Sequence, residues 1–282
     1  MKQLHILIFL LCFQFTAYSA DKVKLVILHT NDTHSQVEPS EKSSLPTSNM
    51  GGYARRLGMI EKIRSEENNV LLFDAGDYWQ GTPYFNFFNG RIEIDALNRM
   101  KYDAVTMGNH EFDNGIDTLA AIIQNLKVPL ISSNYDVTKS VIRDFVKPWI
   151  IFKKAGLKIG IMALNVNPES LILENNIKGI SYLDPIAKAQ EISEHLKNKE
   201  KCDLIICLSH LGSDENSRSV NDFEIARKTK FIDVIIGGHS HTMLENAKTR
   251  NAAGRDVIIA QMAKSGFFLG RIDLYLTKTM HN

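Results

Sequence analysis

The sequence has little cysteine and no excess of charge of either sign. Its 282 residues include 33 Lys and Arg against 32 Asp and Glu, so the formal net charge is +1. This balance argues against a general nucleic-acid binder and against an acidic buffer or chaperone. With 44% hydrophobic and 23% charged residues, the composition also excludes a disordered tail, a collagen-like fibre and a coiled coil. Any partner must therefore be sought in local sites.

The few cysteines do not form a disulfide framework. Cys202 and Cys207 lie on one expected strand, where a rise of about 3.3 Å per residue separates them by about 16 Å and turns them to opposite faces. A disulfide needs Cα atoms within about 7 Å of each other. We therefore expect no intrachain disulfide, and we expect both side chains to be buried as small hydrophobes.

Residues 1–20 differ in kind from the rest of the chain. Lys2 is followed by the apolar run Leu4–Phe15 and then by small residues that include Ala17 and Ala20. This is the layout of a secretory signal peptide, and the run is shorter than the roughly 20 residues of a membrane span. We expect a cleaved signal and an exported, periplasmic or secreted protein without a stable membrane span. An uncleaved N-terminal anchor is the alternative.

The remainder, residues 21–282, is expected to be one catalytic domain. Apolar runs alternate with amphipathic stretches, which indicates an α/β fold, and hairpin signals indicate mixed sheets. We expect a hairpin of Ile150–Phe152 with Leu157–Ala163, and a final β pair of Val257–Gln261 with Leu269–Leu276. Further strands are expected over Val23–Leu28, Val70–Phe73, Ala104–Met107, Val128–Ile131, Leu204–Leu208 and Val234–Ile236, and helices over Tyr53–Arg64, Ile92–Met100, Ile116–Leu126 and Asp184–Lys197.

Five of the nine histidines follow strand-like runs, where open α/β sheets gather ligands. Singly these signals are weak, because Asp77 alone could form an Asx turn and His210 alone could be a core histidine. His239 and His241 are stronger: two imidazoles two residues apart on a strand or at its exit point to the same side. The segments are LVILHTNDTH (25–34), LLFDAGD (71–77), VTMGNHEFD (105–113), LIICLSH (204–210) and VIIGGHSH (234–241).

Together these segments predict a dinuclear metal site. Two Asp, one Asn and four His suffice for two cations, and Asp77 is the best-placed bridging carboxylate. Two metals about 3.5–4 Å apart can clamp a phosphate and activate a bound water. His110, beside Asn109, then has the position of a general acid, and Asp113 can orient its ring.

The segments resemble the calcineurin-like metallophosphoesterase superfamily, and within it the catalytic domain of bacterial 5′-nucleotidases and UDP-sugar hydrolases. The resemblance implies a four-layer αββα sandwich with two mixed β-sheets. The superfamily pattern D-x-H, G-D, G-N-H-E/D, H and G-H-x-H is matched, in order, by Asp32-Thr33-His34, Gly76-Asp77, Gly108-Asn109-His110-Glu111, His210 and Gly238-His239-Ser240-His241.

The resemblance also implies the role of each residue. His110 and Asp113 would form the catalytic dyad, and Asn109 and His110 would contact the substrate. Mixed nitrogen and oxygen ligation suits Zn, Mn or Fe. The first metal would be held by Asp32, His34, Asp77 and His241, and the second by Asp77, Asn109, His210 and His239.

The expected function is that of an exported dinuclear phosphohydrolase that releases phosphate from nucleoside 5′-monophosphates. A nucleoside 2′,3′-cyclic phosphate, a UDP-sugar or another small phosphodiester is the alternative substrate, since the metal site does not distinguish them. No P-loop, H-E-x-x-H zincin or G-x-S-x-G motif occurs in the sequence, and no basic cluster points to nucleic acid.

Members of this family usually carry a C-terminal domain with substrate arginines and an aromatic clamp. This chain ends at Asn282, so we expect that domain to be absent and a separately encoded one to be a possible partner. An aromatic cluster follows Asp77. We favour core packing for it, and a substrate wall or a docking face for the partner is the alternative. The cluster comprises Tyr78, Trp79, Tyr84, Phe85, Phe87 and Phe88.

Overall fold

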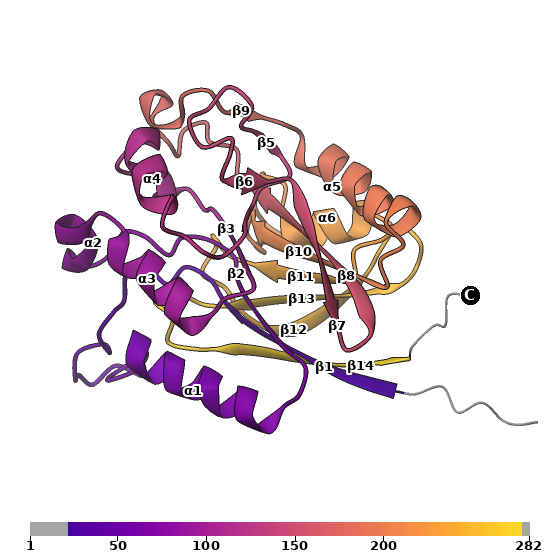
Figure 1. Cartoon of the computed structure of the whole chain (residues 1–282), viewed down its shortest axis with the longest axis horizontal. Helices are drawn as coiled ribbons and strands as arrows, with labels where there is room; N and C mark the ends of the chain where they lie inside the picture. The colour runs from indigo at the N-terminus through magenta and orange to yellow at the C-terminus, as the bar shows by residue number, and fades with distance from the viewer. Residues whose placement is uncertain (1–21, 278–282) are drawn as a thin grey trace, which may run out of the picture.

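The computed structural model describes residues 22–277, which form four layers (Figure 1). Two six-stranded sheets pack face to face, and helices cover the outer side of each. The expected αββα sandwich with two mixed sheets is thereby confirmed. The predicted signal peptide, residues 1–20, lies outside the described residues. Among the described residues, no helix has the length and apolar character that a membrane crossing requires.

The first sheet holds the strands that lead to three of the five predicted site segments. Strands β1, β2, β3, β4 and β6 run parallel, while β14 is antiparallel to β1. In spatial order the strands are β14 (Gly270–Thr277), β1 (Lys22–Thr30), β2 (Val70–Asp74), β3 (Ala104–Thr106), β4 (Leu130–Ile131) and β6 (Val146–Lys147).

The second sheet holds the other two segments. Its four central strands are parallel and both edge strands are antiparallel. In spatial order they are β12 (Met243–Arg250), β13 (Asp256–Met262), β11 (Val234–Gly237), β10 (Leu204–His210), β8 (Leu157–Asn165) and β7 (Trp149–Lys154). A small two-stranded sheet pairs β5 (Tyr135–Asp136) with β9 (Ser181–Tyr182).

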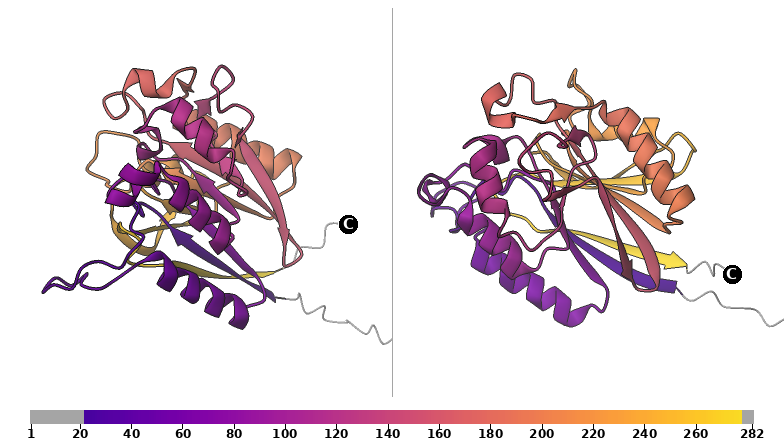
Figure 2. Two further views of the ribbon diagram at one scale, coloured as in Figure 1. Left: turned by 60° about the vertical axis from the view of Figure 1, so that its left-hand side comes forward. Right: turned by 45° about the horizontal axis from the view of Figure 1, so that its top comes forward.

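Side-chain alternation on the strands builds the layers. On β1, Val26 and Leu28 pack beneath the helices, whereas Leu25 and Ile27 pack between the sheets. Burying each such side chain contributes about 1.5–3 kcal/mol. The first sheet is covered by α1 (Tyr53–Glu66), α2 (Pro83–Phe88), α3 (Arg91–Met100) and α4 (Ile116–Ile123), and the second by α5 (Pro185–Glu194) and α6 (Asp222–Lys228), as Figure 2 shows from two sides.

The expected pairing of Val257–Gln261 with Leu269–Leu276 is wrong. Strand β13 pairs with β11 and β12 in the second sheet, while β14 pairs with β1 in the first sheet. Both segments are apolar enough for either sheet, so their pattern carries no information about the partner. Strand β12 was not expected, because it is a polar edge strand with alternately exposed side chains.

Several smaller features agree with the sequence. Asp184 caps α5 by accepting the Ala187 backbone N–H at 2.7 Å, with Pro185 in the first turn. The hairpin of β7 and β8 forms as expected. Cys202 and Cys207 are free and buried, as expected for small hydrophobes.

Candidate metal centre

The predicted site residues come from the carboxyl ends of five parallel strands. The candidate side chains lie at the last residue of a strand or in the loop that follows it, and in both sheets these ends meet at one edge of the sandwich. Asp32 and His34 follow β1, Asp77 follows β2, Asn109 and His110 follow β3, His210 is the last residue of β10, and His239 and His241 follow β11.

The structure brings all of these residues together. Within each of three groups, the donor atoms lie within 4.8 Å of one another. Asn109 joins them, because its Oδ1 lies 3.1 Å from His239 Nδ1. The three groups are Asp32 with His34 and His241, His34 with Asp77 and His110, and Asp77 with His210 and His239.

His239 and His241 join different groups although they are two residues apart. Both lie in the loop after β11 with positive φ angles, 73° and 54°. Their positions are therefore set by the turns of this loop and not by strand alternation. The loop is anchored to the first sheet, because the backbone N–H of His239 donates to both carboxylate oxygens of Asp32 at 3.0 Å.

The donor geometry fits divalent cations. His34 Nε2 lies 3.0 Å from His241 Nε2, and Asp32 Oδ1 lies 3.5 Å from His241 Nε2. Two donors that are each about 2.1 Å from one ion lie about 3.0–3.4 Å apart at ligand angles near 90–110°. The buried Nε2 of His210 points to the same conclusion, because it faces the Asp77 carboxylate and has no other hydrogen-bond partner among the described residues.

His210 is held in the orientation of a metal ligand. Its Nδ1–H donates to the Ala75 carbonyl at 2.7 Å, which leaves Nε2 facing Asp77, whose Oδ2 is 3.0 Å away. Burial lowers the pKa of His210, but the Asp77 carboxylate outweighs burial and raises that pKa to about 10. In the protein without cations, a proton on His210 Nε2 therefore supplies the positive charge next to Asp77 that a metal ion would otherwise supply.

His239 and His34 favour their neutral form. Burial lowers the pKa of His239 to about 4, and the positive charge on His210 acts in the same direction. Burial also lowers the pKa of His34. Neutral imidazole is the form that binds metals. The cluster thus combines neutral nitrogen donors with the Asp32 and Asp77 carboxylates.

His110 and Asp113 form the predicted pair at the solvent side of the cluster. They lie at the two ends of a single 3₁₀ turn, His110–Phe112 and its cap, with His110 Nδ1 2.8 Å from Asp113 Oδ2. The hydrogen bond that His110 Nδ1–H donates to Asp113 raises the pKa of His110 to about 9, against the opposing effect of burial. His110 Nδ1–H is therefore engaged by Asp113, and the ring is in its protonated, positively charged form at neutral pH.

The loops after β2 and β3 approach each other closely. Gly76 adopts φ +91°, and a Cβ on it would lie 2.5 Å from the backbone nitrogen of Gly108. Only glycine permits both the angle and the contact. This approach brings Asp77 next to Asn109 and His110.

Two buried amides that the motif search did not single out hold the loops in place. Asn31 donates to Asp32 Oδ2 at 2.7 Å and to the Ala263 carbonyl at 2.8 Å. Gln261 donates to the Gly238 carbonyl at 2.5 Å and accepts the Thr242 N–H at 2.5 Å. A polar residue inside an apolar strand, as Gln261 is in β13, is the only signal the sequence offers for such a role.

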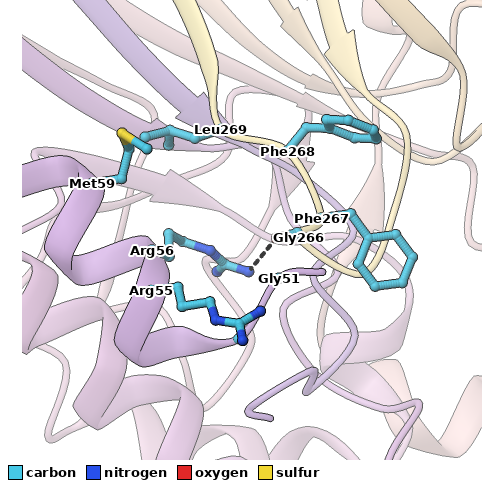
Figure 3. A pocket seen from close by; sticks show the side chains of 9 residues that line it. Gly51, Arg55, Arg56, Met59, Gly266, Phe267, Phe268 and Leu269 are labelled. Atoms are coloured by element: carbon cyan, nitrogen blue, oxygen red, sulfur yellow. Dashed lines mark hydrogen bonds between the residues drawn. The ribbon is translucent and has the colours of Figure 1, made fainter. Parts of the chain in front are cut away.

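The loop between β13 and β14 reaches the cluster from a separate cavity of about 160 Å³ beside α1 (Figure 3). In this cavity Arg56 points at Gly266 and its Nη2 donates to the Gly266 carbonyl at 3.4 Å. On the other side, the Ser265 N–H donates to the Asp32 carbonyl at 2.7 Å. The loop thus links α1 to the backbone of Asp32, while the described residues that line the cavity include none of the candidate ligands.

Larger cavities adjoin the cluster itself. One of about 640 Å³ is bordered by His239 and by Asn167, Tyr182 and Arg218.

The aromatic cluster after Asp77 does not line this cavity, and its rings differ in burial. As favoured from the sequence, Tyr78, Trp79 and Phe85 are core residues, but Phe87 and Phe88 are 78% and 45% exposed.

Comparison with known proteins identifies the family. The sequence model of the calcineurin-like phosphoesterases matches residues 25–243, a span that contains every candidate ligand. The chain belongs to the calcineurin-like phosphoesterases. This family uses divalent metals, and the donor set of this phosphoesterase fits them.

Relatives of this phosphoesterase include nucleotidases. It is 34% identical to a snake venom 5′-nucleotidase of Crotalus adamanteus over 91% of this chain and 46% of that protein. It is 31% identical to the trifunctional nucleotide phosphoesterase protein YfkN of Bacillus subtilis over 89% of this chain and 18% of that protein. The structure of the Haemophilus influenzae NAD nucleotidase superposes with a TM-score of 0.81 at 31% identity, over 91% of this chain and 48% of that one. The chain spans less than half the length of these curated relatives.

Proposed function

We propose that this phosphoesterase is an exported dinuclear-metal phosphohydrolase that releases phosphate from nucleoside 5′-monophosphates. The observation that carries the proposal is the cluster of seven candidate ligands with the His110–Asp113 pair at its edge. The resemblance to nucleotidases supports the nucleotide as substrate. Export rests on the signal-like residues 1–20 alone.

We assign the ligands as the sequence resemblance implies. Asp77 shares one donor group with His34 and another with His210 and His239, so its carboxylate lies between the ligands assigned to the two cations, which supports a bridging role. When bound, the cations would neutralise charge on the phosphoryl oxygens and supply a water nucleophile at neutral pH. One cation would be held by Asp32, His34, Asp77 and His241, and the other by Asp77, Asn109, His210 and His239.

His110 would hold the proton that the leaving group needs. Its raised pKa keeps the ring protonated at neutral pH, and Asp113 fixes Nδ1 so that Nε2 is the free donor. Delivery of that proton to the departing oxygen avoids release of an alkoxide. The Asn109 side chain, next to His110, would contact the phosphoryl group. The cavity of about 640 Å³ beside His239 offers room for a nucleoside.

A second candidate is a catalytic subunit that requires a separately encoded C-terminal domain. The exposed rings of Phe87 and Phe88 favour it, because they offer an apolar surface to another domain. In either case the chemistry at the metals would be the same. A 2′,3′-cyclic nucleotide or a UDP-sugar remains the alternative substrate.

Phosphate release tests the proposal. The purified chain would be assayed with Mn²⁺ or Zn²⁺ on AMP, 2′,3′-cyclic AMP and UDP-glucose, with an EDTA-treated sample as control. Metal-dependent release from AMP, faster than from the other two, supports a self-sufficient 5′-nucleotidase. Preference for another substrate would replace the nucleotide assignment. No release from protein that carries two metals would favour the subunit that needs a partner.

A further inference from the structure

Glu111 is completely buried beside the candidate metal centre, yet it is neither a candidate ligand nor part of the His110–Asp113 pair. All of its hydrogen bonds in the described structure come from backbone N–H groups. Oε2 accepts from Asp77 at 3.0 Å and from Gly108 at 2.5 Å, and Oε1 accepts from Tyr78 at 2.9 Å and from Trp79 at 3.1 Å. Four donors fill the accepting capacity of one carboxylate.

These four donors belong to two different loops. Three of them follow β2 and include the backbone of Asp77, while Gly108 opens the loop after β3 that continues through Asn109 and His110. A second bond closes the arrangement, because the backbone N–H of His110 donates to Asp77 Oδ1 at 2.9 Å. One side chain therefore sets the distance between the loop that carries the candidate bridging carboxylate and the loop that carries its neighbours.

The chemistry of the four partners requires a carboxylate. Every partner is a donor, so an amide in place of the carboxylate would direct an NH₂ group at two N–H groups and leave them unpaired. Burying a charge costs several kcal/mol unless it is fully paired, and here the pairing is with backbone alone. The Glu111 carboxylate thus pairs all four backbone N–H groups and fixes the two loops relative to each other, which a neutral side chain would not do.

We propose that Glu111 is a positioning residue that holds the loops after β2 and β3 at the separation that metal binding requires. The inference rests on the metal site of the proposed function. It differs from a purely structural role in what it predicts: loss of Glu111 weakens the binding of cations beyond its effect on the stability of the metal-free protein.

The test is Glu111→Gln in the full chain, with the Mn²⁺ affinity measured by calorimetry. The melting temperature is recorded with and without Mn²⁺. We expect Mn²⁺ binding about 10–100-fold weaker than in the wild type, as for other residues that orient ligands. The rise in melting temperature that Mn²⁺ causes should shrink accordingly, because that rise follows the ratio of metal concentration to Kd.

Asp233→Asn is the matched control. Asp233 also accepts a backbone N–H through its carboxylate, from Ile205 at 2.9 Å, but it does so at the opposite ends of the strands. The Asp233→Asn substitution should lower the melting temperature of the metal-free protein and leave the Mn²⁺ affinity unchanged. If Glu111→Gln behaves like this control, with Mn²⁺ affinity within about threefold of the wild type, Glu111 is only structural and the proposal is overturned.

Should Glu111→Gln not fold, Glu111→Asp decides by the same measurement. It keeps the charge but is shorter by one methylene, so it cannot hold both loops at their present distance. Weaker Mn²⁺ binding supports the proposal, and wild-type binding contradicts it. Neither variant is judged by hydrolysis. A wild type that binds Mn²⁺ but cleaves no phosphoester would refute a self-sufficient phosphohydrolase and leave the Glu111 result intact.

Discussion

Replacing Gly108 by alanine tests whether the cluster is a metal site through a single added methyl group. The backbone angle of Gly108 does not lie in the left-handed region, so alanine can adopt it without strain. The added Cβ would instead lie 2.1 Å from Asp77 Oδ1 and 2.5 Å from His210 Nε2. The perturbation therefore acts on two candidate ligands and not on the turn.

The required movement sets the size of the effect. A carbon atom normally approaches other heavy atoms no closer than about 3.5 Å, so the His210 side chain must withdraw by about 1.0 Å and the Asp77 side chain by about 1.4 Å. Metal–ligand distances tolerate about 0.2 Å, and a 1 Å misplacement costs about 100-fold in rate. Overpacking adds about 1–3 kcal/mol of destabilisation. We expect Gly108→Ala to lower kcat/KM for AMP at least 100-fold and to weaken Mn²⁺ binding measurably.

Gly58→Ala provides the control. Gly58 lies on the exposed side of α1, and a Cβ there meets no atom within 4 Å. The substitution should stabilise the helix by about 0.5–1 kcal/mol and leave both hydrolysis and Mn²⁺ binding unchanged. A Gly108→Ala protein with wild-type Mn²⁺ affinity would refute the reasoning, whatever its activity.

Three further predictions concern other parts of the molecule. His110→Ala should lower kcat at least 100-fold with Mn²⁺ affinity retained in calorimetry; lost affinity would make His110 a ligand instead. Arg218→Ala should raise KM for AMP with little change in kcat, and an unchanged KM would exclude this cavity as the nucleoside site. Burial lowers the pKa of His29 to about 4 from an ordinary value of about 6.5. The neutral buried ring therefore contributes fully to the free energy of unfolding above pH 6.5, and this contribution is lost as the pH falls to 4. That loss is about 3 kcal/mol, and His29→Leu should remove this part of the pH dependence in urea unfolding at pH 7 and 4.5, whereas an unchanged dependence would show that His29 is not responsible.

The candidate site could be predicted from the sequence because its residues are concentrated at the ends of apolar runs. Parallel strands bring such ends together whatever the details of the fold, so Asp32, Asp77 and His210 could be grouped without knowledge of the sheet order. The resemblance to a family then added the assignment of residues to two groups and the four-layer architecture, which spacing alone does not contain.

What the sequence does not reveal is contacts made with backbone atoms. Glu111 and Gln261 hold loops through N–H and carbonyl groups, and every residue has these groups, so no pattern of side chains predicts the pairing. The same applies to β14, whose apolar alternation fits an edge of either sheet. The sequence does not determine which rings of the aromatic cluster are buried either. That division depends on where α2 ends, and a tight turn at Asn89, with φ 53°, ends it just after the exposed Phe88.

The pairing of β14 with β1 has a consequence for the order in which the protein forms during synthesis. Strand β1 is buried over most of its length, and in the described part of the chain the strand that pairs with one of its edges is Gly270–Thr277, about 240 residues later. At roughly 5–20 residues per second, that edge stays uncovered on the ribosome for about 10–50 s. An open apolar edge is a site for mispairing with other chains. Truncations before residue 270 should therefore aggregate even though every candidate ligand is present.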